Sequence, residues 1–275
     1  MMTVEELLVY GKSLVHSDHA KILLAEIINK NPLELLNHLN DLIDEEKAIA
    51  YKNMIEALKE GKPLQYVLGK VNFYGNTFII NNNVLIPRFE TEELVEHTIE
   101  YCKKYFTEPI DLVDLGCGSG VIGLTLEKKL STNSVDLIDI SKEALEVTHK
   151  NCGLLNSNAK IIQNDFLNNI DKKYDLIISN PPYIKNNEEI EQIVKDNEPH
   201  LALYAGEDGL DCYRKILKEI KKNCKERCLI AFEIGFEQAE AIIELVKKYI
   251  DKCKIEVKKD LQERDRMLFI LINLE

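Results

Sequence analysis

The hydrophobic positions of the chain follow two different periods. Over residues 1–62, apolar residues recur three and four positions apart, which predicts amphipathic helices beginning near residues 3, 20, 32 and 44. Thr3 and Glu6 have the spacing of a capping box at the start of the first helix. Gly61 and Pro63 end the last one, because glycine favours a helix terminus and proline cannot continue the helix. Residues 1–62 therefore predict a small helical bundle, which we expect to serve substrate recognition or scaffolding.

The pattern changes between residues 63 and 88. Tyr66, Val67 and the apolar residues that follow favour strand, and Gly75 and residues 81–83 (three asparagines) are turn signals. This segment predicts a β-hairpin linker between the bundle and the remainder of the chain.

From residue 89 to residue 275, short apolar runs alternate with helical patterns. The runs predict buried strands, and their regular alternation with helices predicts an α/β fold with a doubly wound, mostly parallel sheet. The expected strands lie at residues 110–115, 135–140, 160–163, 175–179 and 228–234, with two further strands at the end of the chain.

The composition of the chain argues against several classes of function. The net charge of −12 and the sequence pI of about 5.1 argue against a protein that coats nucleic acid. The chain has no apolar run of membrane-spanning length, and its acidic N-terminus is unlike a signal peptide, so we expect no membrane contact. Seven cysteines without a framework spacing indicate reduced thiols in a cytoplasmic protein. We expect no metal, since Cys224 and Cys228 have no further ligands nearby in the sequence.

One candidate site follows the strand at residues 175–179. Pro181 and Pro182 cannot donate to a sheet ladder, so Asn180 should stand at the carboxyl end of a strand, where open α/β sheets bind ligands. The prolines leave their carbonyls free as acceptors, and Tyr183 adds an aromatic face. Such a site can hold a planar amino group by accepting both of its hydrogens. An ordinary turn with Asn as turn former is the alternative.

A second candidate site follows the strand at residues 110–115. Gly116, Gly118 and Gly120 form a glycine-rich turn before a helix, which brings backbone amides close to a ligand. An acidic residue, Asp114, precedes them, and this arrangement fits an adenosylmethionine pocket better than a pyrophosphate. Asp139 ends the next strand, at the place where a carboxylate can bind both ribose hydroxyls.

Two further segments belong to this edge of the sheet. Residues 164–166 (Asn-Asp-Phe) follow the strand at 160–163, where polar groups and the Phe166 ring could meet the edge and the face of an adenine. Phe166 could equally be a loop anchor packed on the core. The long charged segment at 184–208 is a candidate lid or substrate wall.

Together these motifs resemble class I methyltransferases that use S-adenosylmethionine. Three further motifs are residues 63–69 (PLQYVLG), 85–92 (LIPRFETE) and Glu198-Pro199 ahead of 206–210 (GEDGL). With them, the chain more narrowly resembles the release-factor glutamine methyltransferases (PrmC/HemK type). The resemblance spans nearly the whole chain. Phe89 departs from the proline usual in the family, and Phe166 stands where many members carry tryptophan.

The resemblance implies a seven-stranded class I methyltransferase sheet and a reaction. The methyl group of S-adenosylmethionine would pass to the side-chain amide nitrogen of the glutamine in the Gly-Gly-Gln motif of class I peptide chain release factors. Asn180, Pro181 and Tyr183 would be catalytic, with Pro182 also against the substrate. The protein would be a cytoplasmic monomer without direct nucleic-acid contact. The cofactor would contact Gly116, Cys117, Gly118, Ser119, Gly120, Asp139, Phe166 and Asn180.

Three other functions remain open. Adenine also presents a planar amino group, so the site could methylate a nucleic-acid base, although the acidic pI counts against that reading. The substrate could be a glutamine of a different protein. Alternatively, the chain could bind adenosylmethionine or a partner without catalysis, against which Asn180 and Asp139 argue.

Overall fold

The computed structural model describes residues 1–274, which divide into two compact units. The first comprises Met1–Lys70 and Glu191–Asn197, and the second comprises Val71–Ile190 and the chain from Glu198 onward. Each unit buries a hydrophobic cluster of its own, so each has the core that an independently folding domain needs. Across residues 1–274, none of the helices combines the length and the apolar character that a membrane crossing demands.

The first unit is helical, as its 3.6-residue period predicts. The capping box is present: the Glu6 amide donates to Thr3, and the Thr3 amide donates to Glu6. A two-residue strand pair, β1 with β2, lies beside the helices. The elements are β1 (Met2–Thr3), α1 (Val4–Leu14), α2 (Ser17–Ile28), the 3₁₀ helix η1 (Leu35–His38), β2 (Leu42–Ile43), α3 (Glu45–Lys59), α4 (Leu64–Leu68) and α8 (Gln192–Asn197).

Two predictions in this part of the chain are wrong. The helix expected from Pro32 is only the short η1, because Asn31 accepts a hydrogen bond from the Leu33 amide and so favours a turn. Tyr66 and Val67, predicted as strand, lie in α4. The Pro63 carbonyl accepts from both of their amides and starts the helix, which overrides their strand propensity.

The β-hairpin begins later than expected. It consists of β3 (Lys70–Phe73) and β4 (Asn76–Ile79), joined through Tyr74 and Gly75, both with positive φ. Phe73 and Phe78 are fully buried, with their rings edge to face. Asn151 of α7 exchanges hydrogen bonds with the backbone of Ile79, which ties the hairpin to the larger core.

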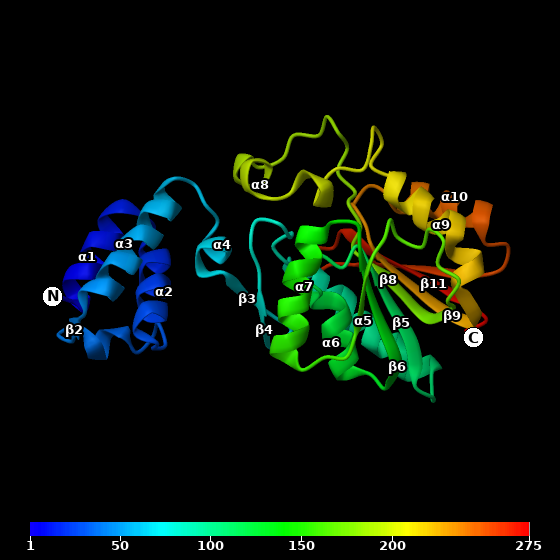
Figure 1. Cartoon of the computed structure of the whole chain (residues 1–275). Coiled ribbons are helices and arrows are strands. Elements are labelled where there is room, and N and C mark those ends of the chain that lie inside the picture. The colour runs from blue at the N-terminus through cyan, green and yellow to red at the C-terminus, as the bar shows by residue number, and fades with distance from the viewer. Residues whose placement is uncertain (275) are drawn as a thin grey trace. The chain divides into compact units, whose positions relative to one another are not determined.

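The second unit contains the predicted seven-stranded sheet, with the order β10-β11-β9-β8-β5-β6-β7 (Figure 1). Within residues 1–274, β11 runs antiparallel to both β10 and β9, and the other neighbouring strands of the sheet run parallel. The strands are β5 (Ile110–Leu115), β6 (Thr132–Asp139), β7 (Lys160–Gln163), β8 (Tyr174–Ser179), β9 (Cys224–Glu233), β10 (Lys254–Lys259) and β11 (Asp265–Ile272). The helices are α5 (Phe89–Tyr105), α6 (Val121–Lys129), α7 (Lys142–Leu155), α9 (Asp211–Asn223) and α10 (Ala239–Tyr249), with the 3₁₀ helix η2 (His200–Ala202).

Helices cover both faces of the sheet, and successive residues of its central strands serve opposite faces. Leu112 and Ile178 pack with residues of α5, α6 and α7, whereas Val113 and Ile177 pack with residues of α9 and α10. Figure 1 shows the helices on the two sides of the sheet. A strand buried on both sides reads as a continuous apolar run, which is why residues 175–179 were recognisable in the sequence.

The site is positioned by the sheet order. β5 lies between β6 and β8, so the chain turns to one side after β5 and later crosses to the other. Crevices at such a switch point bind ligands in open α/β sheets. The Ser179 hydroxyl donates to the Leu115 carbonyl over 2.6 Å, which holds the carboxyl ends of β5 and β8 together.

Candidate active site

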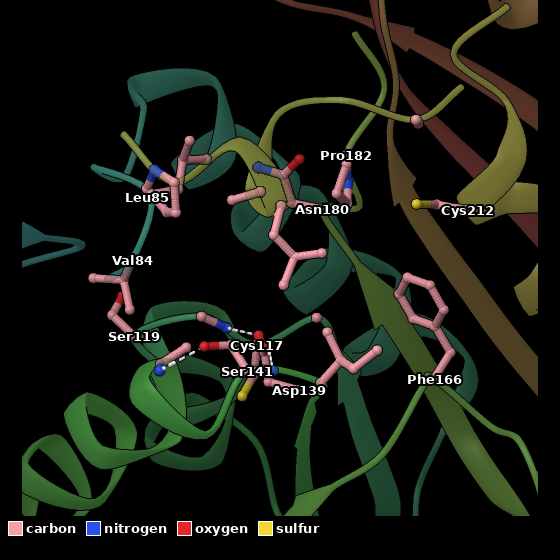
Figure 2. A pocket seen from close by; sticks show the side chains of 18 of the residues that line it. Val84, Leu85, Cys117, Ser119, Asp139, Ser141, Phe166, Asn180, Pro182 and Cys212 are labelled. Carbon is pink, nitrogen blue, oxygen red and sulfur yellow. Dashed lines mark hydrogen bonds between the residues drawn. The ribbon is translucent and has the colours of Figure 1, made fainter. Parts of the chain in front are cut away.

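A cavity of about 500 Å³ lies at the carboxyl ends of β5, β6, β7 and β8. Asn180 and Pro182 lie on one side of it, with Asp139 and Ser141 opposite (Figure 2). The two candidate sites of the sequence are therefore walls of one cavity. The predicted residues that line it are Gly116, Cys117, Gly118, Ser119, Asp139, Phe166, Asn180 and Pro182.

The glycine loop, residues 116–120, differs from the expectation in how it meets a ligand. The amides of Gly116 and Cys117 donate to the Ile138 carbonyl, that of Gly118 donates to Asp139, and that of Gly120 donates to the Cys117 carbonyl. These four amides are already used within the protein. A phosphate-binding loop aims such amides at its ligand, so the loop is suited to a ligand without phosphate.

Helix α7 holds the loop from behind. The Thr148 hydroxyl donates to the Gly118 carbonyl over 2.7 Å, and the Asn151 amide donates to the Ser119 carbonyl over 2.8 Å. Gly120 begins α6 with φ +81°, and a Cβ there would come within 3.1 Å of Leu124 and Thr148. Gly120 does not line the cavity within the described chain; its visible role is close packing of loop and helix.

Asp139 is placed as predicted, at the end of β6. Its side chain accepts from the Gly118 amide at 2.8 Å and from the Ser141 amide at 2.9 Å. A carboxylate offers about four acceptor positions, so these two amides leave acceptor capacity for a ligand. Burial raises the pKa of Asp139, while these amide hydrogen bonds oppose the rise. Asp139 is thus a buried carboxylate that faces a cavity, and a bound diol would satisfy its remaining acceptor positions.

Phe166 also reaches the cavity, although it packs partly against the core. Its backbone has φ +50°, which is uncommon for a bulky residue and turns the ring away from the strand direction. The Asn164 side-chain amide donates to the Phe166 carbonyl over 2.9 Å and holds this turn. Phe89, which departs from the family pattern, is exposed at the start of α5 and is not among the described residues that line the cavity.

The Asn180 side chain is held by two buried residues that the sequence did not single out. Its amide nitrogen donates to the Thr91 hydroxyl at 3.2 Å, and that hydroxyl donates to Glu233 at 2.7 Å. Thr91 lies in the first turn of α5, and Glu233 ends β9 beside β8. Only Thr91 had a sequence signal, through its place in residues 85–92.

Pro181 and Tyr183 do not line the cavity within the described chain. The Tyr183 ring is packed at the edge of the core, with its hydroxyl 3.5 Å from Glu233, and burial raises the pKa of this hydroxyl. The Tyr183 carbonyl accepts from Gln238 over 2.9 Å. A Cβ at Gly209 would come within 2.3 Å of that carbonyl oxygen, so the close approach of residues 206–210 requires glycine.

Glu198, from the motif Glu198-Pro199, makes contact with the motif at residues 85–92. It is 5% exposed and accepts from the Ile86 amide at 3.0 Å and from the Arg88 guanidinium at 2.5 Å. Arg88 also donates to the Ile86 carbonyl. The carboxylate therefore holds residues 85–88 against the start of η2, and Leu85, Pro87, Pro199 and Leu201 from these segments line the cavity.

We expect Glu198→Ala to lower the free energy of unfolding by about 2–3 kcal/mol, because it leaves the Ile86 amide and a half-buried guanidinium without their acceptor. Chemical denaturation measures this change. Glu189→Ala, at an exposed position of the same long segment, is the control and should change stability by less than about 0.5 kcal/mol. Equal stabilities of the two variants would show that Glu198 does not hold the segments together.

Comparison with known proteins gives two family matches. Residues 16–69 match the PrmC N-terminal domain, and residues 94–202 match the Methyltransferase small domain. The two matches fall on the helical unit and on the part of the sheet that carries the glycine loop and Asn180.

The structure resembles solved methyltransferases in fold. A methyltransferase from Pyrococcus furiosus superposes with a TM-score of 0.55 and 14% identity, over 80% of this chain and 98% of that one. The 16S rRNA N2 G1207 methyltransferase of T. thermophilus, solved with AdoMet and guanosine, gives a TM-score of 0.52 and 14% identity, over 74% of this chain and 49% of that one. At these identities the comparison shows the class I methyltransferase fold alone.

Comparison with sequence relatives identifies the family, which the structural comparison does not. In an alignment of 285 positions, the chain is 38% identical to a release factor glutamine methyltransferase of Bacillus subtilis, and the alignment covers 99% of both chains. It is also 38% identical over 232 residues to one of Flavobacterium psychrophilum, across 82% of this chain and 81% of that one. With the predicted fold and cavity in place, this identity over the full length shows that the chain belongs to the release factor glutamine methyltransferase family.

Proposed function

We propose that this protein transfers a methyl group from S-adenosylmethionine to the side-chain amide nitrogen (N5) of the glutamine in the Gly-Gly-Gln motif of class I peptide chain release factors. The observation that supports it most directly is Asn180, whose amide faces the cavity that also contains the glycine loop and Asp139. Family membership supports the choice of substrate. Such a substrate would place the enzyme in the cytoplasm.

The cavity fits the cofactor by its chemistry. Asp139 keeps acceptor positions for the two ribose hydroxyls, and Phe166 offers an aromatic face for adenine. The glycine loop uses its amides internally and suits a ligand without phosphate. When bound, S-adenosylmethionine supplies an electrophilic methyl group on a sulfonium sulfur.

The main chemical difficulty of the reaction is the low reactivity of the substrate nitrogen, which Asn180 can help to overcome. An amide nitrogen is a poor nucleophile because its lone pair is delocalised into the carbonyl. If the Asn180 side-chain oxygen and the Pro181 carbonyl each accept one hydrogen of the substrate amide, they orient its nitrogen toward the methyl group. The nitrogen gains the methyl and then loses one proton, which is acidic on a methylated amide, so no strong base is needed beforehand. Positioning and aimed dipoles would do most of the work, with Pro182, which lines the cavity, beside the substrate amide.

A transfer assay with tritiated methyl donor separates the possible functions. The full-length protein is incubated with a class I release factor, a release factor whose Gly-Gly-Gln glutamine is replaced, total RNA and DNA. We expect label in the intact release factor only. Label in nucleic acid would support the base-methylating function, label in the substituted release factor would indicate a different glutamine, and no label would indicate a binding module.

We also propose that the helical unit recognises the release factor. Deleting residues 1–61 should leave the affinity for S-adenosylmethionine nearly unchanged, because all residues of the cavity lie after residue 82. The kcat/KM for full-length release factor should fall by about tenfold or more, which equals about 1.4 kcal/mol of lost binding. Steady-state kinetics measures it. A short Gly-Gly-Gln peptide is the control substrate, and both proteins should methylate it equally. Undiminished methylation of the full-length factor would rule out this role.

A further inference from the structure

The direction of the Asn180 amide matters for the proposed reaction. A side-chain amide has an oxygen on one side and an NH₂ group on the other, and the two are almost equal in size. Only the oxygen can accept a hydrogen of the substrate amide. A rotation by half a turn would present a donor to another donor, so the protein needs a device that fixes which side faces the substrate.

The structure contains such a device, a chain of hydrogen bonds that runs from Asn180 through Thr91 to Glu233. An ionised carboxylate can only accept hydrogen bonds. The Thr91 hydroxyl, 2.7 Å from Glu233, must therefore donate its single hydrogen to it. Thr91 is left with lone pairs for Asn180, and only the NH₂ side of the amide can donate to them, over 3.2 Å. The amide oxygen is then directed away from Thr91.

The elements that carry these residues are rigid and buried. Thr91 is 2% exposed and Glu233 is 1% exposed. Glu233 ends β9 one residue beyond Phe232, which pairs with Ser179, so Glu233 and Asn180 leave adjacent parallel strands at the same level. Buried polar groups in such a place are held in one arrangement, because water cannot compete for them.

We propose that Thr91 and Glu233 are positioning residues that fix the Asn180 amide with its oxygen toward the substrate amide. This inference rests on the proposed function of Asn180. Glu233 sets the direction of the Thr91 hydroxyl, and the hydroxyl, at the wall of the cavity, sets the direction of the amide.

The surroundings of Glu233 make the device sensitive to pH. Burial raises the pKa of Glu233 to about 7, and Glu90 adds to the rise. The hydrogen bond from Thr91 opposes this rise in pKa, as do Arg266 on β11 and the Tyr183 hydroxyl after β8. The Tyr213 hydroxyl of α9 donates to the main-chain carbonyl of Glu233 and not to its side chain.

Protonation would reverse the chain of donors. A protonated Glu233 can donate to the Thr91 hydroxyl, which is then free to donate to the oxygen of Asn180, and the amide turns round. The active orientation of Asn180 therefore exists above the pKa of Glu233 and is lost as pH falls through about 7.

The first test measures methyl transfer in a single turnover at saturating cofactor and release factor. Thr91→Val keeps the shape but removes the hydroxyl, and it should slow transfer by about tenfold or more, since a buried hydrogen bond is lost. Thr91→Ser should retain most of the rate. The matched control is Thr98→Val, which removes a buried hydroxyl two turns along α5 that donates to the Leu94 carbonyl within its own helix.

The pH profile and the cofactor affinity distinguish positioning from a merely structural role. The unsubstituted protein should lose rate below about pH 7, and Glu233→Gln should flatten that loss, while affinity for S-adenosylmethionine stays the same in all variants. If Thr91→Val is as fast as Thr91→Ser, or if Glu233→Gln keeps the full pH dependence, the inference is overturned and the proposed function stands.

A second measurement does not depend on activity. The side-chain ¹⁵N–¹H resonances of Asn180, assigned by their loss in Asn180→Asp, should titrate with a midpoint near pH 7 and should no longer do so in Glu233→Gln. Resonances that do not respond to pH or to Glu233→Gln would overturn the inference. Absence of methyl transfer by the unsubstituted protein, with this titration present, would instead contradict the proposed function alone.

Discussion

Asn180→Ala should slow methyl transfer by about 10²–10³-fold, the usual cost of removing one preorganised hydrogen-bonding group from an active site. The fold should remain intact, because the residue follows β8 and its side chain packs into neither core cluster. Single-turnover transfer to a release factor measures the rate, and calorimetry with S-adenosylmethionine confirms that the variant still binds it. A normal rate in Asn180→Ala would exclude the proposed mechanism.

Asn180→Asp tests whether the activity needs the neutral amide or only an acceptor of the same size. Aspartate has the same size and keeps an acceptor, but it loses the NH₂ group that donates to Thr91. The single hydrogen of the Thr91 hydroxyl cannot serve both a new carboxylate and Glu233. The added charge would also lie close to the sulfonium. We therefore expect Asn180→Asp to be about as slow as Asn180→Ala, whereas near-normal activity would mean that an acceptor of the right size is sufficient.

Asp139→Ala should weaken the binding of S-adenosylmethionine by about 10- to 100-fold, because two hydrogen bonds to a charged acceptor contribute about 1.5–3 kcal/mol. The transfer rate at saturating cofactor should fall less, since Asp139 lies across the cavity from Asn180 (Figure 2). Calorimetry measures the affinity. The matched control is Glu143→Ala, an exposed carboxylate at the rim of the same cavity. Equal affinities of the two variants would remove Asp139 from the ribose.

The sheet and the cavity could be predicted because their signals are local. Residues 110–115 and 175–179 are buried on both faces and therefore appear as unbroken apolar runs. The glycine loop and Asn180 each follow a buried strand and Asp139 ends one, so their meeting at one edge of a parallel sheet follows from the strand pattern alone. The family resemblance added the reaction, which the strand pattern does not contain.

The residues that orient the site could not be predicted in the same way, because their contacts are not local. Glu233 meets Thr91 across 142 positions of the chain, and Glu198 meets Ile86 across 112. The error at Tyr66 and Val67 has the opposite cause. Their strand propensity is real, but Pro63 and packing in the bundle outweigh it.

The central claim is tested most directly by locating the methyl group. A class I release factor is incubated with this protein and S-adenosylmethionine, digested, and analysed by tandem mass spectrometry, with Asn180→Ala as the parallel reaction. We predict one added methyl group on the Gly-Gly-Gln glutamine, on its side-chain nitrogen, and little or none with Asn180→Ala. An unmodified glutamine after reaction with the unsubstituted protein, or equal modification by Asn180→Ala, would contradict this account.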